Sequence, residues 1–73
     1  MEIKSGIYQH YRGGKYKVFG VFKHSETLGK FVAYEALYDN PESKLWVRPI
    51  ELFTDQVEWK GKTIPRFTYL RDS

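Results

Sequence analysis

Apolar and polar residues alternate over short stretches of the chain, with the two-residue period that is typical of β-strands. The clearest stretch is 30–38 (KFVAYEALY), where one face carries Val32, Tyr34, Ala36 and Tyr38. Glutamate, alanine and leucine also suit a helix. The β-branched and aromatic residues and the turns on both sides nevertheless favour a strand.

Other extended stretches cover 6–11, 15–24 and 45–48, and a hairpin is expected over 57–64. The longest of them contains Gly20 near its centre, where a glycine often marks a bend or a bulge. Turns rich in glycine or polar residues separate these stretches at 13–14, 25–29, 39–43 and 60–61. The pattern therefore predicts several short strands joined by tight turns.

A short helical turn is expected near 49–54, because proline suits the first position of a helix, where its missing N–H costs nothing. The residues of this turn expected in the core are Ile50, Leu52 and Phe53. Residues 65–67 then close the domain, and 70–73 are expected to form a flexible tail. Together these elements predict a mainly β fold over residues 1–73 as a single domain, in the form of a small, strongly bent SH3-like or Tudor-like β-barrel.

The chain has 73 residues, which is enough for one small hydrophobic core. Area scaling indicates that folding buries about 60% of the surface of the unfolded chain, which leaves little margin of stability. Aromatic residues make up 18% of the chain, and each of them buries a large apolar area. We therefore expect most aromatic side chains to lie in the core.

The formal net charge is +3, with 12 Lys and Arg residues interspersed among 9 Asp and Glu residues. This scattered charge permits an anionic partner, but it lacks the concentrated positive charge of a dedicated DNA-binding domain. The sequence has no cysteine, which excludes disulfides and thiolate metal sites. No apolar stretch approaches the ~20 residues that span a membrane, and the first residues lack the apolar stretch expected of a signal peptide. We expect a soluble, cytoplasmic protein.

The segment 46–49 (WVRP) is the most informative candidate for a binding site. On a strand, Trp46 and Arg48 point to the same face. An aromatic ring beside a planar cation is a recognition surface for an anionic or aromatic group. We expect aromatic rings to stack on a planar part of a ligand while arginines bind its anionic part. The residues assigned to these two tasks are Tyr34, Tyr38 and Trp46, and Arg48 and Arg66.

The segment 24–26 (HSE) resembles the His-x-Glu motif of zinc deaminases. Those enzymes also need a Pro-Cys-x-x-Cys half-site, which a chain without cysteine lacks. The spacing of His10, His24 and Glu26 fixes no metal geometry, so neither a metal nor another cofactor is expected. Glu26 either forms a structural ion pair with one of the two arginines above or orients that arginine toward a ligand.

Several short motifs together resemble one protein family. They are GxYxHY at 6–11, GGxY at 13–16, HSET at 24–27, YxALY at 34–38, WVRPxExF at 46–53 and PRF at 65–67. In this order and spacing they resemble the DUF1653 family of small bacterial proteins, over nearly the whole chain. The hairpin of the family usually has an acidic residue before its glycine, where this chain has Lys60.

The family has no assigned function, so the resemblance implies a bacterial, cytoplasmic, single-domain protein without implying a mechanism. The family pattern includes His24, Glu26, Tyr34, Tyr38, Trp46, Arg48 and Arg66, all of which are present here. We therefore keep His24 and Glu26 among the candidate ligand-binding residues.

Three functions remain open from the sequence. The first is a binding module that recognises a nucleotide or nucleic acid through the aromatic and arginine residues. The second is a protein–protein interaction domain that uses an exposed sheet edge or the aromatic groove. The third is a small enzyme with His24 and Glu26 as acid and base. Salt dependence separates the first two, because binding to nucleic acid releases counterions. The sequence leaves the oligomeric state open.

Overall fold

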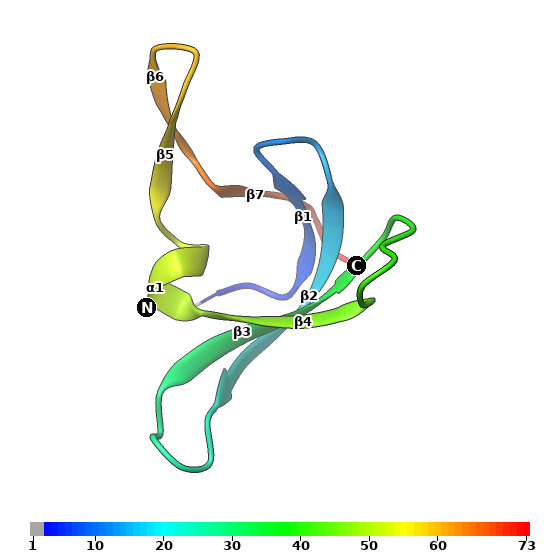
Figure 1. The fold of residues 1–73 in the computed structure, drawn as a ribbon, viewed down its shortest axis with the longest axis vertical. Coiled ribbons are helices and arrows are strands. Elements are labelled where there is room, and N and C mark those ends of the chain that lie inside the picture. Colours follow the sequence, from blue (N-terminus) through cyan, green and yellow to red (C-terminus); the bar gives the residue numbers. More distant parts are fainter. Residues whose placement is uncertain (1–2) are drawn as a thin grey trace.

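A computed structural model describes residues 3–73, and β-strands predominate in it (Figure 1). In chain order the elements are β1 (Gly6–His10), β2 (Lys15–Lys23), β3 (Lys30–Ala36), β4 (Leu45–Pro49), α1 (Ile50–Phe53), β5 (Gln56–Trp59), β6 (Lys62–Pro65) and β7 (Phe67–Arg71). Five strands form one antiparallel sheet in the order β4-β3-β2-β1-β7, while β5 and β6 form a separate hairpin. The mainly β fold with one short helical turn is confirmed. Within residues 3–73, no helix has the length and apolar character needed to cross a membrane.

Two predicted boundaries differ from the observed ones. β3 ends at Ala36, two residues before the predicted end, and the loop to β4 begins there. Leu70 and Arg71, which were expected in the flexible tail, belong to β7. Arg71 is opposite Ile7 in the antiparallel pairing of β7 with β1, and this pairing orders the segment.

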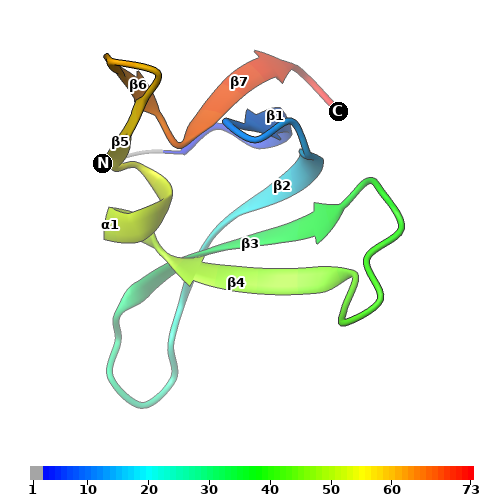
Figure 2. The same cartoon turned by 45° about the horizontal axis from the view of Figure 1, so that its top comes forward.

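The five-stranded sheet bends so strongly that β1 and β7 face β3 and β4 across the core, and α1 covers one end (Figures 1 and 2). β4 and β7 are the two edges of this sheet in the described part of the chain. No strand of residues 3–73 joins these edges, because β5 and β6 leave the sheet as a hairpin of their own. The sheet is therefore open in this part of the chain, and the SH3-like or Tudor-like barrel expected from the sequence is not confirmed.

A bulge divides β2 into two halves. The pairing register with β3 shifts between Val18 and Gly20, which leaves Phe19 as the extra residue. Gly20 has a φ of 141°, a conformation that other residues rarely adopt. Before the bulge Val18 is buried, whereas after it Phe22 is 53% exposed. The bend predicted at Gly20 is confirmed, and it carries the second half of β2 away from the core.

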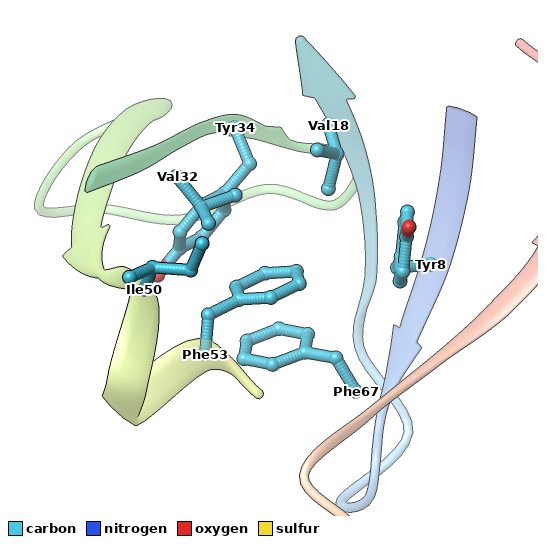
Figure 3. Packing of buried hydrophobic residues seen from close by; sticks show 7 residues of the cluster. All are labelled: Tyr8, Val18, Val32, Tyr34, Ile50, Phe53 and Phe67. Carbon is cyan, nitrogen blue, oxygen red and sulfur yellow. The ribbon is translucent and has the colours of Figure 1, made fainter. Parts of the chain in front are cut away.

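The core lies between the two halves of the bent sheet and α1 (Figure 3). Its buried residues are Tyr8, Val18, Val32, Tyr34, Ile50, Phe53 and Phe67. The rings of Phe53 and Phe67 stack at a centroid distance of 4.2 Å, with 9° between their planes. α1 supplies Ile50 and Phe53, but Leu52, which was expected in the core, is exposed because a single helical turn does not direct all three side chains inward.

The strands β2, β3 and β4 have an inner face, which turns toward β1 and β7, and an outer face. In the pairing of β3 with β4, Tyr34 is opposite Trp46 and Val32 is opposite Arg48. Opposite residues point to the same side of a sheet, and Val32 and Tyr34 are buried in the core. Trp46 and Arg48 therefore both belong to the inner face. The alternation in the sequence predicted that they share a face, and the pairing with β3 shows which face it is.

Candidate ligand-binding site

A hollow of about 190 Å³ opens on the inner face, and we call it the inner hollow. It is lined by Tyr16, Tyr34, Asn40, Trp46 and Arg48. The pairing of β2, β3 and β4 brings four of these residues side by side, and the loop between β3 and β4 supplies Asn40. Three predicted site residues thus share one hollow, namely Tyr34, Trp46 and Arg48.

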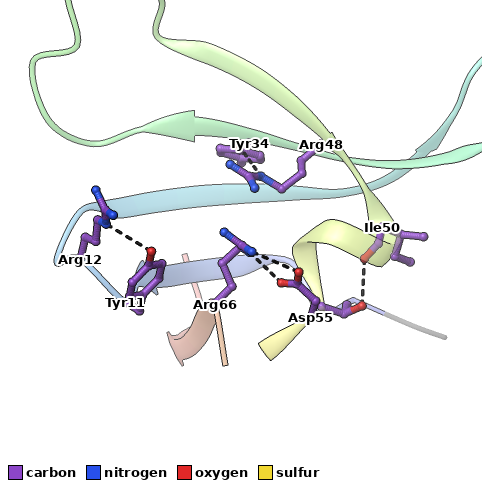
Figure 4. Close-up of polar contacts among 8 residues, drawn as sticks. Tyr11, Arg12, Tyr34, Arg48, Ile50, Asp55 and Arg66 are labelled. Atoms are coloured by element: carbon purple, nitrogen blue, oxygen red, sulfur yellow. Dashed lines mark hydrogen bonds and ion pairs between the residues drawn. The ribbon is translucent and has the colours of Figure 1, made fainter. Parts of the chain in front are cut away.

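Arg48 is held in the inner hollow by neutral groups. Its Nε donates a hydrogen bond of 3.4 Å to the hydroxyl of Tyr34 (Figure 4). Its guanidinium carbon lies 5.6 Å from the ring centroid of Phe67, which is a cation–π distance. Within residues 3–73 no carboxylate forms an ion pair with Arg48. The terminal N–H groups of Arg48 are consequently available to an anion.

Hydroxyl and amide groups line one side of the inner hollow. The hydroxyl groups of Tyr16 and Tyr38 are 2.8 Å apart, and the Asn40 amide donates to the Tyr38 hydroxyl at 3.2 Å. Burial, followed by the hydrogen bond with Tyr38, raises the pKa of Tyr16. Tyr38 is 41% exposed and reaches the hollow through Tyr16. On β4, the indole N–H of Trp46 donates to the carbonyl of Ser43 at 3.0 Å, which fixes the ring.

Sequence reasoning did not assign Tyr16 or Asn40 to the site. Tyr16 shares a strand face with Val18, and this alternation was visible in the sequence. Without the pairing register, nothing indicated that this face meets Trp46. Asn40 lies in a polar loop, whose side-chain directions follow from tertiary structure alone.

Arg66 has a different partner from the one predicted. Its guanidinium donates two hydrogen bonds to Asp55, from Nε to Oδ1 at 2.6 Å and from Nη2 to Oδ2 at 3.1 Å (Figure 4). These hydrogen bonds lower the pKa of Asp55. The expected ion pair of Glu26 with an arginine is not formed within residues 3–73, where Asp55 takes that place. The pair joins the residue before β7 to the residue before β5.

Three arginines surround His10. Burial of His10 lowers its pKa, and the positive charges of Arg48, Arg66 and Arg12 lower it further. The guanidinium groups of Arg48 and Arg66 point toward one another in Figure 4, although they come from different halves of the fold. In the described part of the chain, Asp55 is the carboxylate that forms an ion pair with these arginines, through Arg66. With His10 neutral, the positive charges of the cluster exceed the negative ones, which favours an anion there.

His24 and Glu26 lie in the turn between β2 and β3, which projects from the molecule (Figure 2). His24 Nδ1 accepts hydrogen bonds from the backbone N–H groups of Glu26 at 3.1 Å and Thr27 at 3.3 Å. Along the pairing of β2 with β3, Tyr16 is near one end and this turn follows the other end. The structure therefore does not bring His24 or Glu26 to the inner hollow. Among residues 3–73, no three His, Cys, Asp or Glu side chains are grouped closely enough to hold a metal.

By its fold and its inner hollow, the protein is a small, bent β domain whose inner face is basic and lined by aromatic side chains. The sequence matches the family described as "Protein of unknown function (DUF1653)" over residues 6–69, and the chain belongs to this family. The structure is also similar to the crystal structure of a DUF1653 protein from Bordetella bronchiseptica, with a TM-score of 0.91 and 27% sequence identity, over 97% of this chain and 91% of that one. No curated protein matches the sequence.

Proposed function

We propose that this protein is a binding module for an anionic ligand with a planar ring, of which a nucleotide is the simplest example. The observation that carries the proposal is the position of Arg48. Its guanidinium lies in a hollow beside the Trp46 ring and has no carboxylate partner in the described chain. A planar, permanently charged guanidinium in such a place is suited to bind a phosphate through two hydrogen bonds.

The other candidate residues, in the inner hollow and near it, have distinct tasks in this proposal. Trp46 and the exposed Tyr38 stack on the base, whereas Tyr34 is buried and positions Arg48 through its hydroxyl. Arg66 adds positive charge opposite Arg48 and keeps N–H groups that do not bond to Asp55. His24 and Glu26 have no task at the hollow, so the proposal does not depend on them.

The architecture and the cellular location are further parts of the proposal. The strongly bent sheet, with one helical turn between β4 and β5, supports an SH3-like or Tudor-like arrangement whose barrel is left open. The cysteine-free sequence supports a location in the cytoplasm, where thiols stay reduced and structural disulfides are rare.

The proposal is tested by titrating AMP into the protein and following tryptophan fluorescence at about 50 mM salt, where phosphate contacts are strong. Trp59→Phe provides the background, because Trp46 is then the remaining tryptophan of the two in the chain. We expect quenching with a dissociation constant of about 1 mM or below. Hydrogen bonds to a charged group contribute about 1.5–3 kcal/mol, so Arg48→Gln weakens binding about tenfold or more.

Two controls separate specific binding from general electrostatics. Arg71→Gln removes the same charge at the far end of β7 and leaves the affinity nearly unchanged. Adenosine, which lacks the phosphate, binds more weakly than AMP and does not respond to Arg48→Gln. Tryptophan fluorescence that stays constant up to millimolar AMP contradicts the proposal.

A second candidate function is supported by the outer face of β2, β3 and β4. An apolar groove of about 340 Å³ runs there between Phe19, Phe22, Leu45 and Val47, beside the open edge of β4. An open edge with alternating apolar side chains suits an extended segment of a partner protein. Binding at this groove depends weakly on salt, whereas phosphate binding at Arg48 falls steeply as salt rises.

A further inference from the structure

The β5–β6 hairpin and the inner hollow are joined by side chains in mutual contact. The ring of Trp59, at the end of β5, packs edge-on against Tyr11 with 5.4 Å between their centroids. The Tyr11 ring is 4.6 Å from that of His10, which in turn is 5.0 Å from Phe67. Phe67 is the ring that Arg48 covers. Aromatic rings therefore follow one another from the hairpin to the hollow.

Arginines accompany this row of rings. Arg12 donates a hydrogen bond of 3.2 Å from Nε to the Tyr11 hydroxyl, and its guanidinium carbon lies 5.6 Å from the Tyr11 centroid. Arg66 extends from the same side as Tyr11 toward Arg48 (Figure 4). Positive charge thus lies beside aromatic rings at two places in the row, at Tyr11 and at Phe67, which suits a ligand that carries both phosphates and bases.

The tip of the hairpin continues the same chemistry. Trp59 is 39% exposed and does not belong to the core. The ammonium group of Lys60 lies 5.7 Å from the centroid of its ring, and Lys62 is opposite Trp59 in the hairpin. Lys60 and Gly61 both have positive φ, at 52° and 80°, as a tight hairpin turn requires. The hairpin that carries Trp59, Lys60 and Lys62 projects from the rest of the fold (Figure 1).

The inner hollow is too small to enclose a nucleotide. Pockets that enclose small molecules usually measure about 300–1,000 Å³, whereas this hollow measures about 190 Å³. A ligand held there by one phosphate and one base edge extends over the neighbouring surface. Toward Trp59, the rings of the row that reach this surface are Tyr11 and Trp59, accompanied by Arg12 and Arg66, whereas Phe67 is buried in the core.

We propose that the natural ligand is a single-stranded nucleic acid, bound along the row from the inner hollow to the β5–β6 hairpin with one base stacked on Trp59. This inference rests on the proposed function and extends it from one nucleotide to a strand. Single strands expose the faces of their bases, and stacking on aromatic side chains accepts every base. A duplex hides those faces, and a peptide of acidic residues offers no aromatic rings to stack on Trp59 or Trp46.

The test compares ligands of increasing length. Thymidine monophosphate and oligothymidylates of two, four and eight nucleotides are titrated into the protein by calorimetry at two salt concentrations. We expect the affinity to rise up to about four nucleotides, the lower end of the site sizes of small β modules, and to fall steeply with salt. Trp59→Ala weakens binding of the octanucleotide about tenfold, since it removes one stacked base.

Matched controls use substitutions on other surfaces. Phe19→Ala removes an aromatic side chain of similar exposure, 44%, from the outer face and leaves every affinity unchanged. Trp59→Ala leaves the affinity for thymidine monophosphate unchanged, because a mononucleotide bound at the inner hollow does not reach Trp59. Far-ultraviolet circular dichroism of both variants verifies that the fold is retained.

The outcomes distinguish this inference from the proposed function. If the mononucleotide binds and Arg48→Gln weakens it, but longer ligands gain no affinity, the inference is overturned and the proposed function stands. The same holds if Trp59→Ala weakens mononucleotide and octanucleotide equally, or if an octaglutamate peptide competes as well as the octanucleotide. If neither mononucleotide nor octanucleotide binds, both proposals fall.

Discussion

The inner and outer faces of β2, β3 and β4 are made by alternate residues of the same strands, yet their chemistry differs. On β4 the inner face carries Trp46 and Arg48, whose polar atoms have defined positions against Ser43 and Tyr34. The outer face carries Leu45 and Val47, which are 65% and 63% exposed. The apolar side chains that the sheet exposes most are thus on the outer face, where Glu35 is opposite Leu45 and, among residues 3–73, no arginine lies beside an aromatic ring.

This difference shows how function is divided between the faces. The inner face is half buried against β1 and β7, so a cation without a carboxylate partner there lies in a less polar environment and attracts anions strongly. The outer face offers apolar area and a free strand edge, which suit a protein surface. A small anionic ligand is therefore expected at the inner face, and any protein partner at the outer one.

The largest expected effect concerns stability. Phe53 is buried in the core, and Phe53→Ala lowers the free energy of unfolding by about 3–5 kcal/mol through lost burial and a cavity. Val47→Ala on the outer face changes it by less than about 0.5 kcal/mol. Urea denaturation followed by circular dichroism measures both. A large loss for Val47→Ala that grows with protein concentration would show that the outer face is covered by another copy of the chain.

The sequence predicted the strands and the helical turn, because alternation, turn residues and Pro49 act locally. It also predicted the bend at Gly20, since a glycine in the middle of an apolar strand often marks a bulge or a bend. It did not predict that the sheet stays open. The β5–β6 hairpin itself was predicted from its turn residues. Whether this hairpin joins the edges of the five-stranded sheet depends on contacts between distant residues, which no local pattern specifies.

The candidate site was predictable where it depends on alternation within one strand. Trp46 and Arg48 share a face because they are two residues apart, and Tyr34 joins them through the pairing of β3 with β4. The partner of Arg66 was not predictable in this way. Asp55 and Arg66 meet because the β5–β6 hairpin brings the residue after β6 back beside the residue before β5. The backbone N–H of Arg66 also donates a hydrogen bond to the carbonyl of Asp55 at 3.1 Å.

Two glycines with nearly the same backbone conformation provide a second test. Gly6 and Gly20 have φ values of 145° and 141°, so an alanine is strained by about 1–3 kcal/mol at either position. A Cβ at Gly6 meets the Arg71 carbonyl oxygen at 2.6 Å, whereas a Cβ at Gly20 meets nothing within 4 Å. We expect Gly6→Ala to lower the free energy of unfolding more than Gly20→Ala. Equal losses in chemical denaturation would mean that β1 and β7 separate readily.

Neighbouring residues of β4 test which face binds the ligand. Arg48→Lys keeps the charge on the inner face but loses the planar fork, and we expect AMP binding to weaken about fivefold. Val47→Lys adds a positive charge on the outer face and changes the affinity by less than about twofold, because charges exposed to solvent are screened. Calorimetric titration of both variants measures the difference. A larger response to Val47→Lys would move the site to the outer face.

The smallest expected effect is the pH dependence that His10 gives to the inner face. Burial and then Arg48, Arg66 and Arg12 hold the pKa of His10 below its ordinary value of 6.5. The folded state therefore binds fewer protons than the unfolded state, and the free energy of unfolding falls as the pH decreases through 6.5 toward the lower pKa of the folded protein. Asp55 does not contribute in this range, since its pKa lies below its ordinary value of 3.8.

An anion bound among the three arginines offsets their repulsion of the His10 proton and raises the pKa of His10. Binding consequently strengthens as the pH decreases from 7 to 6, in the direction opposite to the change in stability. The dinucleotide thymidylyl-thymidine is the suitable probe, because its phosphodiester does not titrate in this range. His10→Gln removes both pH dependences while Arg48 stays in place. An affinity that is constant with pH in the unaltered protein would place the bound phosphate away from the arginines around His10, even if Arg48→Gln weakened it.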